Sequence, residues 1–256
     1  MLAICDIISN EKMTDEYNIY SMVIAAPAIA KITKPGQFAH VKCDGLTLRR
    51  PISIASAKNG QIQICYDVRG EGTEWLAGLK SGGKIDVIAP IGKGFDISDT
   101  SKKVLLVGGG IGIYPLYSVA EEYKENAFVV LGFRTKNLIT FEKEFKDCGC
   151  KLYITTDDGS YGRKGFVTET AGEILDDNKN SKIDIIMTCG PKIMMKNIAA
   201  EAVKRNIRCQ VSMEERMACG IGACLACVCK IKGENKRVCI DGPVFDIFEG
   251  SEVDWQ

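Results

Sequence analysis

The run VLLVGGGIGIYPLYSVA, residues 104–120, is the feature that most restricts how this chain can fold. It is the longest stretch without a charged residue, yet it is shorter than the roughly 20 apolar residues that a membrane helix needs. Three consecutive glycines and a proline also interrupt it. We interpret it as a buried strand that passes through a glycine turn into a helix, which is the first unit of a parallel sheet.

The same order of strand and helix repeats after residue 103. Strands that alternate with helices are typical of a parallel sheet with crossover helices on its faces, so we expect an α/β domain here. The predicted strands cover 103–107, 127–133, 151–156 and 182–190, and the predicted helices cover 115–124, 139–147, 168–175 and 192–206.

The first 98 residues follow a different pattern. Short runs rich in β-branched residues recur about every ten residues and are separated by glycine or lysine-rich breaks, which predicts an antiparallel barrel or sandwich. These runs cover 2–8, 19–26, 37–43, 51–56 and 61–68, and one short helix is expected at 73–79.

The end of the chain, from residue 211, is rich in cysteine and has little periodicity. We therefore predict three parts. An N-terminal antiparallel β-barrel domain covers 1–99, a parallel-sheet α/β domain covers 100–210, and a small cysteine module covers 211–256.

Charge excludes one class of partner. Lys plus Arg and Asp plus Glu each number 33, which gives a formal net charge of zero, and no basic run appears. Nucleic acid is therefore not expected as the main partner. The N-terminus lacks the basic-then-apolar order of a signal peptide, so we expect a cytoplasmic protein without a membrane segment.

Twelve cysteines in a chain with a full apolar complement and no signal peptide point to metal or redox chemistry rather than to a disulfide framework. Cys219, Cys224 and Cys227 follow C-x4-C-x2-C, and Cys239 comes eleven intervening residues later. This is the plant-type spacing for a [2Fe–2S] cluster. The alternative is a four-cysteine zinc site, but zinc modules favour two C-x2-C pairs and only one is present. Cys229 adds nothing to the expected spacing, so we leave it outside the ligand set.

The turn at 110–115 reads G-x-G-x-x-P. Glycines let the backbone approach a pyrophosphate, and the N–H groups at the start of the following helix attract anions, so this turn is a candidate dinucleotide site. Pro115 suits the first helical turn. The alternative is a plain tight turn of any α/β protein.

Two further segments follow predicted strands of the same sheet. Cys189-Gly190-Pro191 comes at the end of a parallel strand, where ligands of open α/β sheets bind, and we place it near a nicotinamide. It could equally be only a helix start. The loop TTDDGSYGRKG at 155–165 and Arg134 could contact the nucleotide, or the loop could simply be solvated.

The barrel carries LRRPISIAS at 48–56. An arginine fork at Arg50 suits a pyrophosphate, and a hydroxyl at Ser53 suits a flavin ring nitrogen. Their odd spacing sends them to opposite faces of a regular strand, so a shared ligand requires a twist or bulge at Pro51. A solvated arginine pair is the alternative. His40, the only histidine, is expected to be a barrel residue rather than an acid–base catalyst.

The order R-P-x-S, G-x-G-x-x-P and C-G-P resembles the ferredoxin–NADP reductase superfamily. The C-terminal CGIGACLACVC, preceded by SMEERMA, narrows the resemblance to the electron-transfer subunits of type B (NAD-dependent) dihydroorotate dehydrogenases, over essentially the whole chain. Two departures are Ile52, where the superfamily commonly has an aromatic residue on the flavin, and a chain that continues past the point where many reductases end in an aromatic residue.

The resemblance implies a flavin-binding barrel, a nucleotide-binding α/β domain and a [2Fe–2S] module. It places FAD against Arg50, Pro51, Ile52 and Ser53, with Asp67, Val68 and Arg69 along the ring and ribityl region and Gly72 and Thr73 at the pyrophosphate. It places NAD against Gly110, Gly112, Cys189 and Gly190. It assigns the cluster to Cys219, Cys224, Cys227 and Cys239.

The implied activity is electron transfer from an FMN-containing dihydroorotate dehydrogenase catalytic subunit, through [2Fe–2S] and FAD, to NAD+ in pyrimidine (UMP) biosynthesis. The implied assembly is a heterotetramer with two copies of each subunit, and exposed apolar residues such as Ile221 and Leu225 would face the partner. Two other functions remain open. One is a stand-alone NAD(P)H-dependent flavin and iron–sulfur reductase that feeds another redox partner, and the other is a zinc-stabilised nucleotide-binding module.

Overall fold

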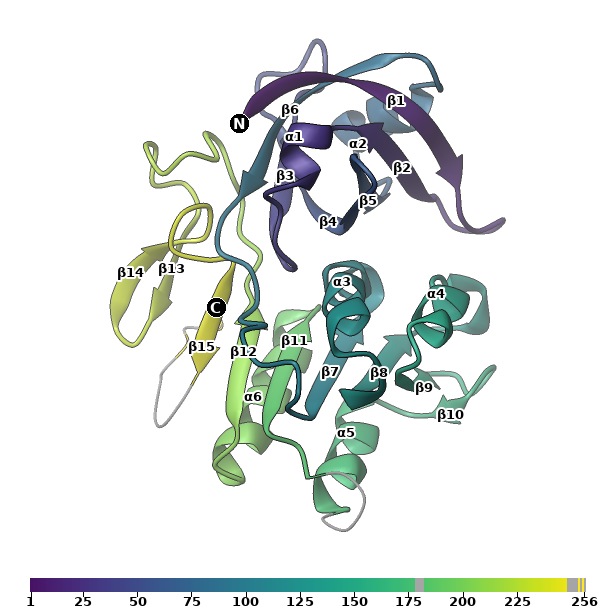
Figure 1. The fold of residues 1–256 in the computed structure, drawn as a ribbon, viewed down its shortest axis with the longest axis vertical. Helices are drawn as coiled ribbons and strands as arrows, with labels where there is room; N and C mark the ends of the chain where they lie inside the picture. Colours follow the sequence, from purple (N-terminus) through teal and green to yellow (C-terminus); the bar gives the residue numbers. More distant parts are fainter. Residues whose placement is uncertain (178–181, 248–252, 254, 256) are drawn as a thin grey trace.

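The N-terminal part is a closed antiparallel barrel, shown in purple and blue in Figure 1. A computed structural model describes residues 1–177, 182–247, 253 and 255. The barrel order is β1-β2-β5-β4-β3-β6. Its strands are β1 (Leu2–Lys12), β2 (Ile19–Ala25), β3 (Phe38–Val41), β4 (Arg50–Lys58), β5 (Gln61–Asp67) and β6 (Lys84–Ile91), and two short helices, α1 (Pro27–Ala30) and α2 (Glu71–Gly78), lie between them. The predicted antiparallel barrel is confirmed.

Alternating residues of these strands fill the barrel. Ile52 and Ile54 of β4, Ile62 and Ile64 of β5, and Val87 of β6 all point into one apolar core. The period of two is the pattern expected of strands with one buried face. Strand β6 was not predicted, because Lys84, Asp86 and Pro90 interrupt its apolar alternation.

The second part is a seven-stranded sheet with the order β10-β9-β8-β7-β11-β12-β15. All neighbouring strands are parallel except β15, which runs antiparallel to β12. The strands are β7 (Val104–Gly109), β8 (Ala127–Phe133), β9 (Lys151–Thr156), β10 (Arg163–Lys164), β11 (Ile185–Cys189), β12 (Arg208–Ser212) and β15 (Val244–Ile247). The predicted parallel-sheet domain is therefore confirmed, with one strand added from the C-terminal segment.

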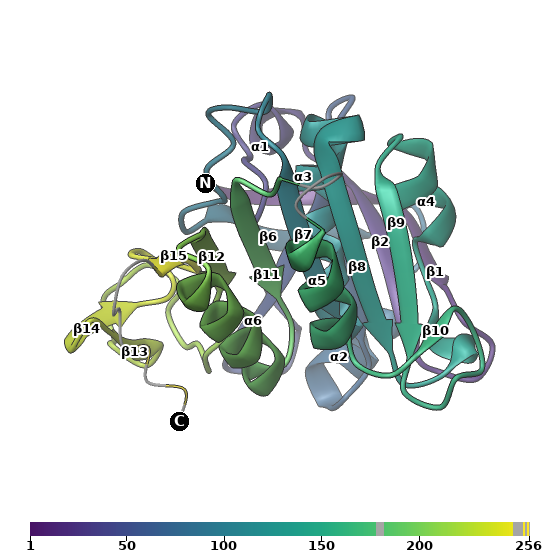
Figure 2. The same cartoon turned by 90° about the horizontal axis from the view of Figure 1, so that it is seen from below.

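Helices cover both faces of this sheet. Helices α5 and α6 pack on one face, and α3 and α4 pack on the other (Figure 2). Helix α3 also lies against the barrel, since its residue Tyr114 shares an apolar cluster with Ala55 and Cys65 (Figure 1). The helices are α3 (Tyr114–Tyr123), α4 (Glu142–Asp147), α5 (Val167–Asp176) and α6 (Lys192–Lys204), with short 3-10 turns η1 (Gly110–Ile113), η2 (Lys124–Asn126) and η3 (Lys136–Leu138).

The cysteine-rich segment lies beside both the barrel and the sheet (Figure 1). It forms the hairpin of β13 (Val228–Ile231) and β14 (Glu234–Arg237) and then returns to the sheet through β15. None of these strands was predicted, and β12 crosses the predicted boundary at 210. The final part of the predicted module, residues 248–252, 254 and 256, lies outside the described residues.

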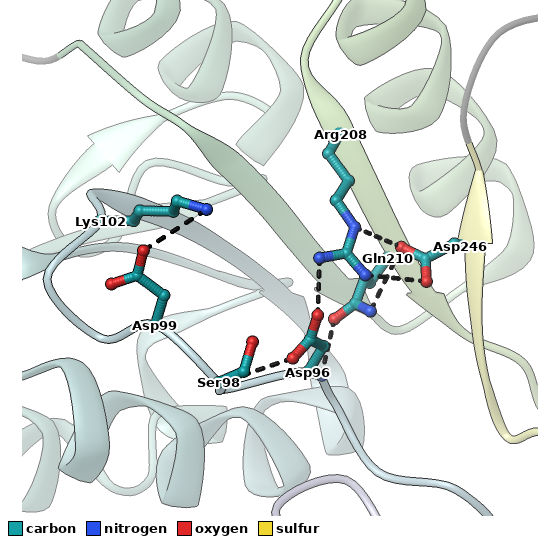
Figure 3. A network of polar contacts seen from close by, with 7 residues as sticks. All are labelled: Asp96, Ser98, Asp99, Lys102, Arg208, Gln210 and Asp246. Carbon is teal, nitrogen blue, oxygen red and sulfur yellow. Dashed lines mark hydrogen bonds and ion pairs between the residues drawn. The ribbon is translucent and has the colours of Figure 1, made fainter.

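A polar network fastens the connection between barrel and sheet (Figure 3). Arg208 on β12 contacts Asp96 of the connecting segment at 2.7 Å and both carboxylate oxygens of Asp246 on β15 at 2.7 and 3.0 Å. The backbone N–H of Asp96 donates to Gln210 Oε1 at 3.0 Å. One arginine therefore joins the segment after the barrel, strand β12 and strand β15.

Among the described helices, none is both long and apolar enough to cross a bilayer.

Candidate functional site

Three of the four predicted cluster cysteines, Cys219, Cys224 and Cys227, lie in the loop between β12 and β13, and Cys239 follows β14. The N–H of Cys219 donates to Cys224 Sγ at 3.4 Å, and the N–H of Ile221 donates to Cys219 Sγ at 3.4 Å. Cys227 and Cys239 form a second pair, since the Cys227 thiol lies near enough to raise the pKa of Cys239. The structure thus brings the four thiols into two pairs, 219 with 224 and 227 with 239.

Backbone N–H groups point toward these sulfurs. The N–H of Ile221, followed by those of Cys224 and Ala223 and the Cys224 thiol, lowers the pKa of Cys219. Burial and the Cys227 thiol raise the pKa of Cys239, while the N–H of Gly222 acts in the opposite direction. Hydrogen bonds to sulfur from a glycine-rich loop are the surroundings that stabilise bound thiolates and tune a cluster.

The donor set fits a two-iron centre. In the parts of the chain that the structure describes, no three Cys, His, Asp or Glu side chains gather where one metal ion could bind. Two pairs of thiols match the two protein ligands that each iron of a [2Fe–2S] cluster takes. Cys229 lies on β13, outside the two pairs, and burial raises its pKa to about 11.

One edge of this loop is open to solvent. Cys224 is exposed, and the flanking Ile221 and Leu225 are 62% and 61% exposed. Leu225 has a positive φ of 60°, which is unusual for a branched apolar residue. Cys227 and Cys239 lie on the inner side, at 2% and 0% exposure. The loop therefore presents one thiol and two apolar side chains outward.

The predicted flavin residues surround the start of α2. A Cβ added at Gly72 would lie 2.3 Å from Arg50 Nε, so the guanidinium lies directly on the first turn of this helix. The Thr73 hydroxyl accepts from the N–H of Arg69 at 2.9 Å and caps the turn. An arginine fork and the free N–H groups of a helix start form a pyrophosphate site together. The structure brings Arg50, Gly72 and Thr73 together.

Strand β4 departs from two details of the prediction. Its register against β3 is regular from Arg50 to Ser53, and the irregularity lies between Ile54 and Ser56. The pairing with β3 therefore has no bulge at Pro51, where a ligand shared by Arg50 and Ser53 would require a twist or bulge. Ile52 points into the barrel core, so only its backbone is available on the outer face. Asp67 and Arg69 form an ion pair at 2.8 Å beside Val68.

The two predicted nucleotide turns lie side by side. Cys189 and Gly108 are register partners at the ends of β11 and β7. A Cβ at Gly112 would lie 2.4 Å from the Cys189 carbonyl oxygen, so Gly112 serves the contact between the turns rather than an open surface. Gly110 has a positive φ of 56° and faces open space among the described atoms. Burial raises the pKa of Cys189 to about 12, although the Ser212 side chain lowers it, so the thiol stays protonated.

The acidic glycine loop closes against the end of β8. The N–H of Asp157 donates to the Phe133 carbonyl at 3.0 Å, and the N–H of Lys136 donates to Ser160 Oγ at 2.8 Å. Arg134 is exposed at the same edge. The carboxyl ends of β7, β8, β9 and β11 therefore share one edge with Gly110, Arg134, this loop and Cys189, as a bound dinucleotide requires.

Two contacts between the barrel and the cluster loop were missed by sequence reasoning. A Cβ at Gly220, beside Cys219, would lie 2.5 Å from His40 Nδ1 on β3. A Cβ at Gly92, after β6, would lie 2.4 Å from Pro243 Cδ. Glycine was the only sequence signal for either contact, and a glycine alone does not identify its distant neighbour. His40 itself lies in the barrel, as predicted.

Two family models match the chain. The model described as "Iron-sulfur cluster binding domain of dihydroorotate dehydrogenase B" matches residues 214–250, and "Oxidoreductase NAD-binding domain" matches residues 106–200. The first match contains all four paired cysteines, and the second contains both nucleotide turns.

Curated relatives match nearly the whole chain. A protein of Caldanaerobacter subterraneus subsp. tengcongensis is 40% identical, with 93% of this chain and 94% of the relative covered, and one of Bacillus velezensis is 41% identical with the same coverage. Both are called "Dihydroorotate dehydrogenase B (NAD(+)), electron transfer subunit". This chain belongs to that family.

Solved structures agree with the fold of a dihydroorotate dehydrogenase B electron-transfer subunit. A chain described under "Insights into flavin-based electron bifurcation via the NADH-dependent reduced ferredoxin-NADP oxidoreductase structure" is 36% identical, has a TM-score of 0.86, and is matched over 99% of this chain and 90% of its own. The ferredoxin reductase of a carbazole 1,9a-dioxygenase, at 18% identity and a TM-score of 0.67, shares the fold over 81% of this chain and 66% of its own. The predicted family, fold and cofactor set of FAD, [2Fe–2S] and NAD are confirmed.

Proposed function

We propose that this chain takes electrons from an FMN-containing dihydroorotate dehydrogenase catalytic subunit and passes them through [2Fe–2S] and FAD to NAD+ in pyrimidine biosynthesis. The observation that carries the proposal is the position of the cluster loop against strand β3 of the barrel. Three of the four thiols lie on a loop whose Gly220 packs against His40, and His40 is the register partner of Pro51 in the flavin motif. The candidate cluster and flavin sites are therefore neighbours.

The barrel residues bind and orient the flavin. When bound, a flavin exchanges electrons singly with an iron–sulfur centre and in pairs, as hydride, with nicotinamide. Arg50 and the N–H groups at Gly72 and Thr73 would hold the pyrophosphate and offset its charge. Ser53 would offer its hydroxyl to the ring, and the segment of Asp67, Val68 and Arg69, which the Asp67–Arg69 ion pair holds, would border it.

The sheet residues hold the nucleotide. Gly110 leaves room for the pyrophosphate, and Gly112 keeps the turn against Cys189 and Gly190. The protonated Cys189 thiol gives the nicotinamide a neutral neighbour. The name of the relatives favours NAD over NADP as the nucleotide. We also propose that the barrel domain covers 1–99, the α/β domain 100–210 and the cluster module 211–256.

The cluster site involves Cys219, Cys224, Cys227 and Cys239 as ligands. An electron-transfer subunit works with a catalytic partner, and we place that partner at the open edge of the loop, at Ile221 and Leu225. We propose a heterotetramer with two copies of each subunit, located in the cytoplasm. The twelve cysteines, none in a disulfide within the described structure, fit a reducing compartment.

A cysteine substitution tests the order of the relay. Cys224→Ser in the co-expressed complex should abolish NAD+ reduction by dihydroorotate and leave NADH oxidation by an artificial flavin acceptor largely intact. Cys229→Ala, which changes a neighbouring thiol outside the ligand set, is the matched control and should retain both activities. Unchanged dihydroorotate-dependent activity in Cys224→Ser would show that the relay order is wrong.

A second candidate is a reductase that feeds a different redox partner. The match of 36% identity over 99% of the chain to a structure described as an NADH-dependent reduced ferredoxin-NADP oxidoreductase favours it. Isolation of the protein at native levels separates the two functions. An FMN-containing partner that co-purifies supports the first, and a stable complex with a different flavoprotein supports the second.

A further inference from the structure

His40 is a fully buried histidine without a hydrogen-bonding partner for its ring. Its residue exposure is 0%, and neither Nδ1 nor Nε2 has a partner among the described residues. It is also the only histidine of the chain. A neutral imidazole carries one N–H donor and one acceptor, and an unsatisfied buried polar group costs about 1 to 3 kcal/mol. An interaction with a bound group would offset this cost for the His40 ring.

The ring is held neutral by its surroundings. Burial lowers the pKa of His40 to about 4, and the Arg49 guanidinium lowers it further, although the Arg49 backbone acts in the opposite direction. Arg49 itself is occupied, since it donates to the His40 carbonyl at 3.3 Å and forms an ion pair with Asp86 at 2.9 Å. The Arg49 guanidinium is therefore engaged with the His40 carbonyl and Asp86 and does not pair with the ring nitrogens.

The ring faces the cluster loop. A Cβ at Gly220 would lie 2.5 Å from Nδ1, 3.1 Å from Cε1 and 3.2 Å from Cγ, so only a glycine allows the ring to approach this closely. Gly220 has a positive φ of 70° and follows Cys219 directly. The next N–H, that of Ile221, points at Cys219 Sγ. Nδ1 thus lies beside the part of the loop whose N–H groups are directed at sulfur.

We propose that His40 is a positioning residue of the iron–sulfur site, and that its ring, which faces Gly220 beside Cys219, would donate a hydrogen bond to a sulfur of the bound cluster. This rests on the proposed function, because it requires a bound cluster. A hydrogen bond to sulfur stabilises the reduced, more negative form, so His40 raises the reduction potential of the site. It also joins the loop to β3, next to the flavin strand β4.

The single histidine allows a direct test on the unmodified complex. Protein labelled only with ring-¹⁵N histidine should show one ¹⁵N coupling to the electron spin of the reduced cluster in pulsed electron paramagnetic resonance. An otherwise normal cluster spectrum without a histidine ¹⁵N coupling would overturn the proposal while leaving the proposed function intact. A sample without any iron–sulfur signal would remove both.

A pair of variants tests the hydrogen bond itself. His40→Leu keeps an apolar body but has no donor, and it should move the cluster midpoint potential to a more negative value. His40→Asn can place an amide N–H near the position of Nδ1 and should restore most of the shift. A potential in His40→Leu equal to the wild-type value contradicts the inference. If His40→Leu fails to fold, the ¹⁵N coupling in the histidine-labelled wild-type protein still tests the hydrogen bond.

Discussion

The Nε of Arg208 and the Oδ1 of Asp246 lie 2.7 Å apart and join β12 to β15, the two strands that flank the cluster loop. The Nη1 of the same arginine reaches Asp96, in the segment that leaves the barrel. Arginine makes this arrangement possible because its planar fork offers several donors in fixed directions. One side chain therefore links the segment that leaves the barrel to the two strands that flank the cluster loop.

Arg208→Ala should destabilise the protein by about 1 to 2 kcal/mol, since the side chain is partly exposed and three charge-assisted hydrogen bonds are lost. Chemical unfolding measures the change. Lys236→Ala removes an exposed ion pair with Glu234 on the hairpin and should change stability by less than about 0.5 kcal/mol. Equal effects in the two variants would show that the network does not hold the parts together.

The pH dependence of stability should contain a contribution from Asp96. Hydrogen bonds from Ser98 and Arg208 lower its pKa from 3.8 to about 2. Because the folded-state pKa is depressed, the stabilisation is fully present above the unfolded value of 3.8 and is lost as the pH falls toward 2. The unfolding temperature of wild type minus that of Asp96→Asn should be constant from pH 7 to 5 and decrease below that. A difference that stays flat down to pH 3 contradicts this.

Gly72→Ala should weaken FAD binding, because the added methyl group collides with Arg50 Nε at 2.3 Å and displaces the guanidinium. Flavin retention after gel filtration and the dissociation constant of FAD measure the effect. Gly78→Ala lies in the same helix and meets no described atom within 4 Å, so it should bind FAD normally and be slightly more stable. Similar flavin loss in both variants would point to helix stability instead.

Gly220→Ala should lower the iron content of purified protein. The methyl group would collide with the His40 ring, and the positive φ of 70° adds backbone strain. Gly233→Ala has a similar φ of 74° in the β13–β14 turn but, within the described structure, open space around it. It isolates the backbone strain and should cost only about 1 kcal/mol without loss of iron. Normal iron content in Gly220→Ala would show that the loop tolerates displacement from the barrel.

Local patterns in the sequence predicted most of the fold. The strand at 127–133 is predicted to the residue, because an apolar run bounded by polar residues leaves little choice. The helix expected at 139–147 begins only at Glu142, since Phe141 adopts a left-handed conformation before it. Strand β15 could not be predicted, because its stability comes from pairing with β12 and the Arg208 contact rather than from its own four residues.

In the candidate site, too, local motifs could be predicted from the sequence, and contacts between distant residues could not. Motifs in the sequence pointed to the four cysteines and to each nucleotide turn, but the pairing of β7 with β11 places the two turns side by side. The position of the strand irregularity near Ser56, rather than at Pro51, depends on the register with β5. The approach of His40 to Gly220 joins residues far apart in the chain, and only the closed barrel brings them together.

The pairing of Ser212 with Val244 means that the chain leaves the sheet and comes back to it at adjacent positions. The segment between these two residues, which carries the four cluster cysteines, is thus anchored at both ends to the same sheet. A segment whose two ends lie close together in the sheet can change in length at a small cost in loop-closure entropy, while the sheet itself stays intact. Deleting everything after Ser212 would instead strip a partner strand from β12 and leave its open hydrogen-bonding edge as a template for self-association.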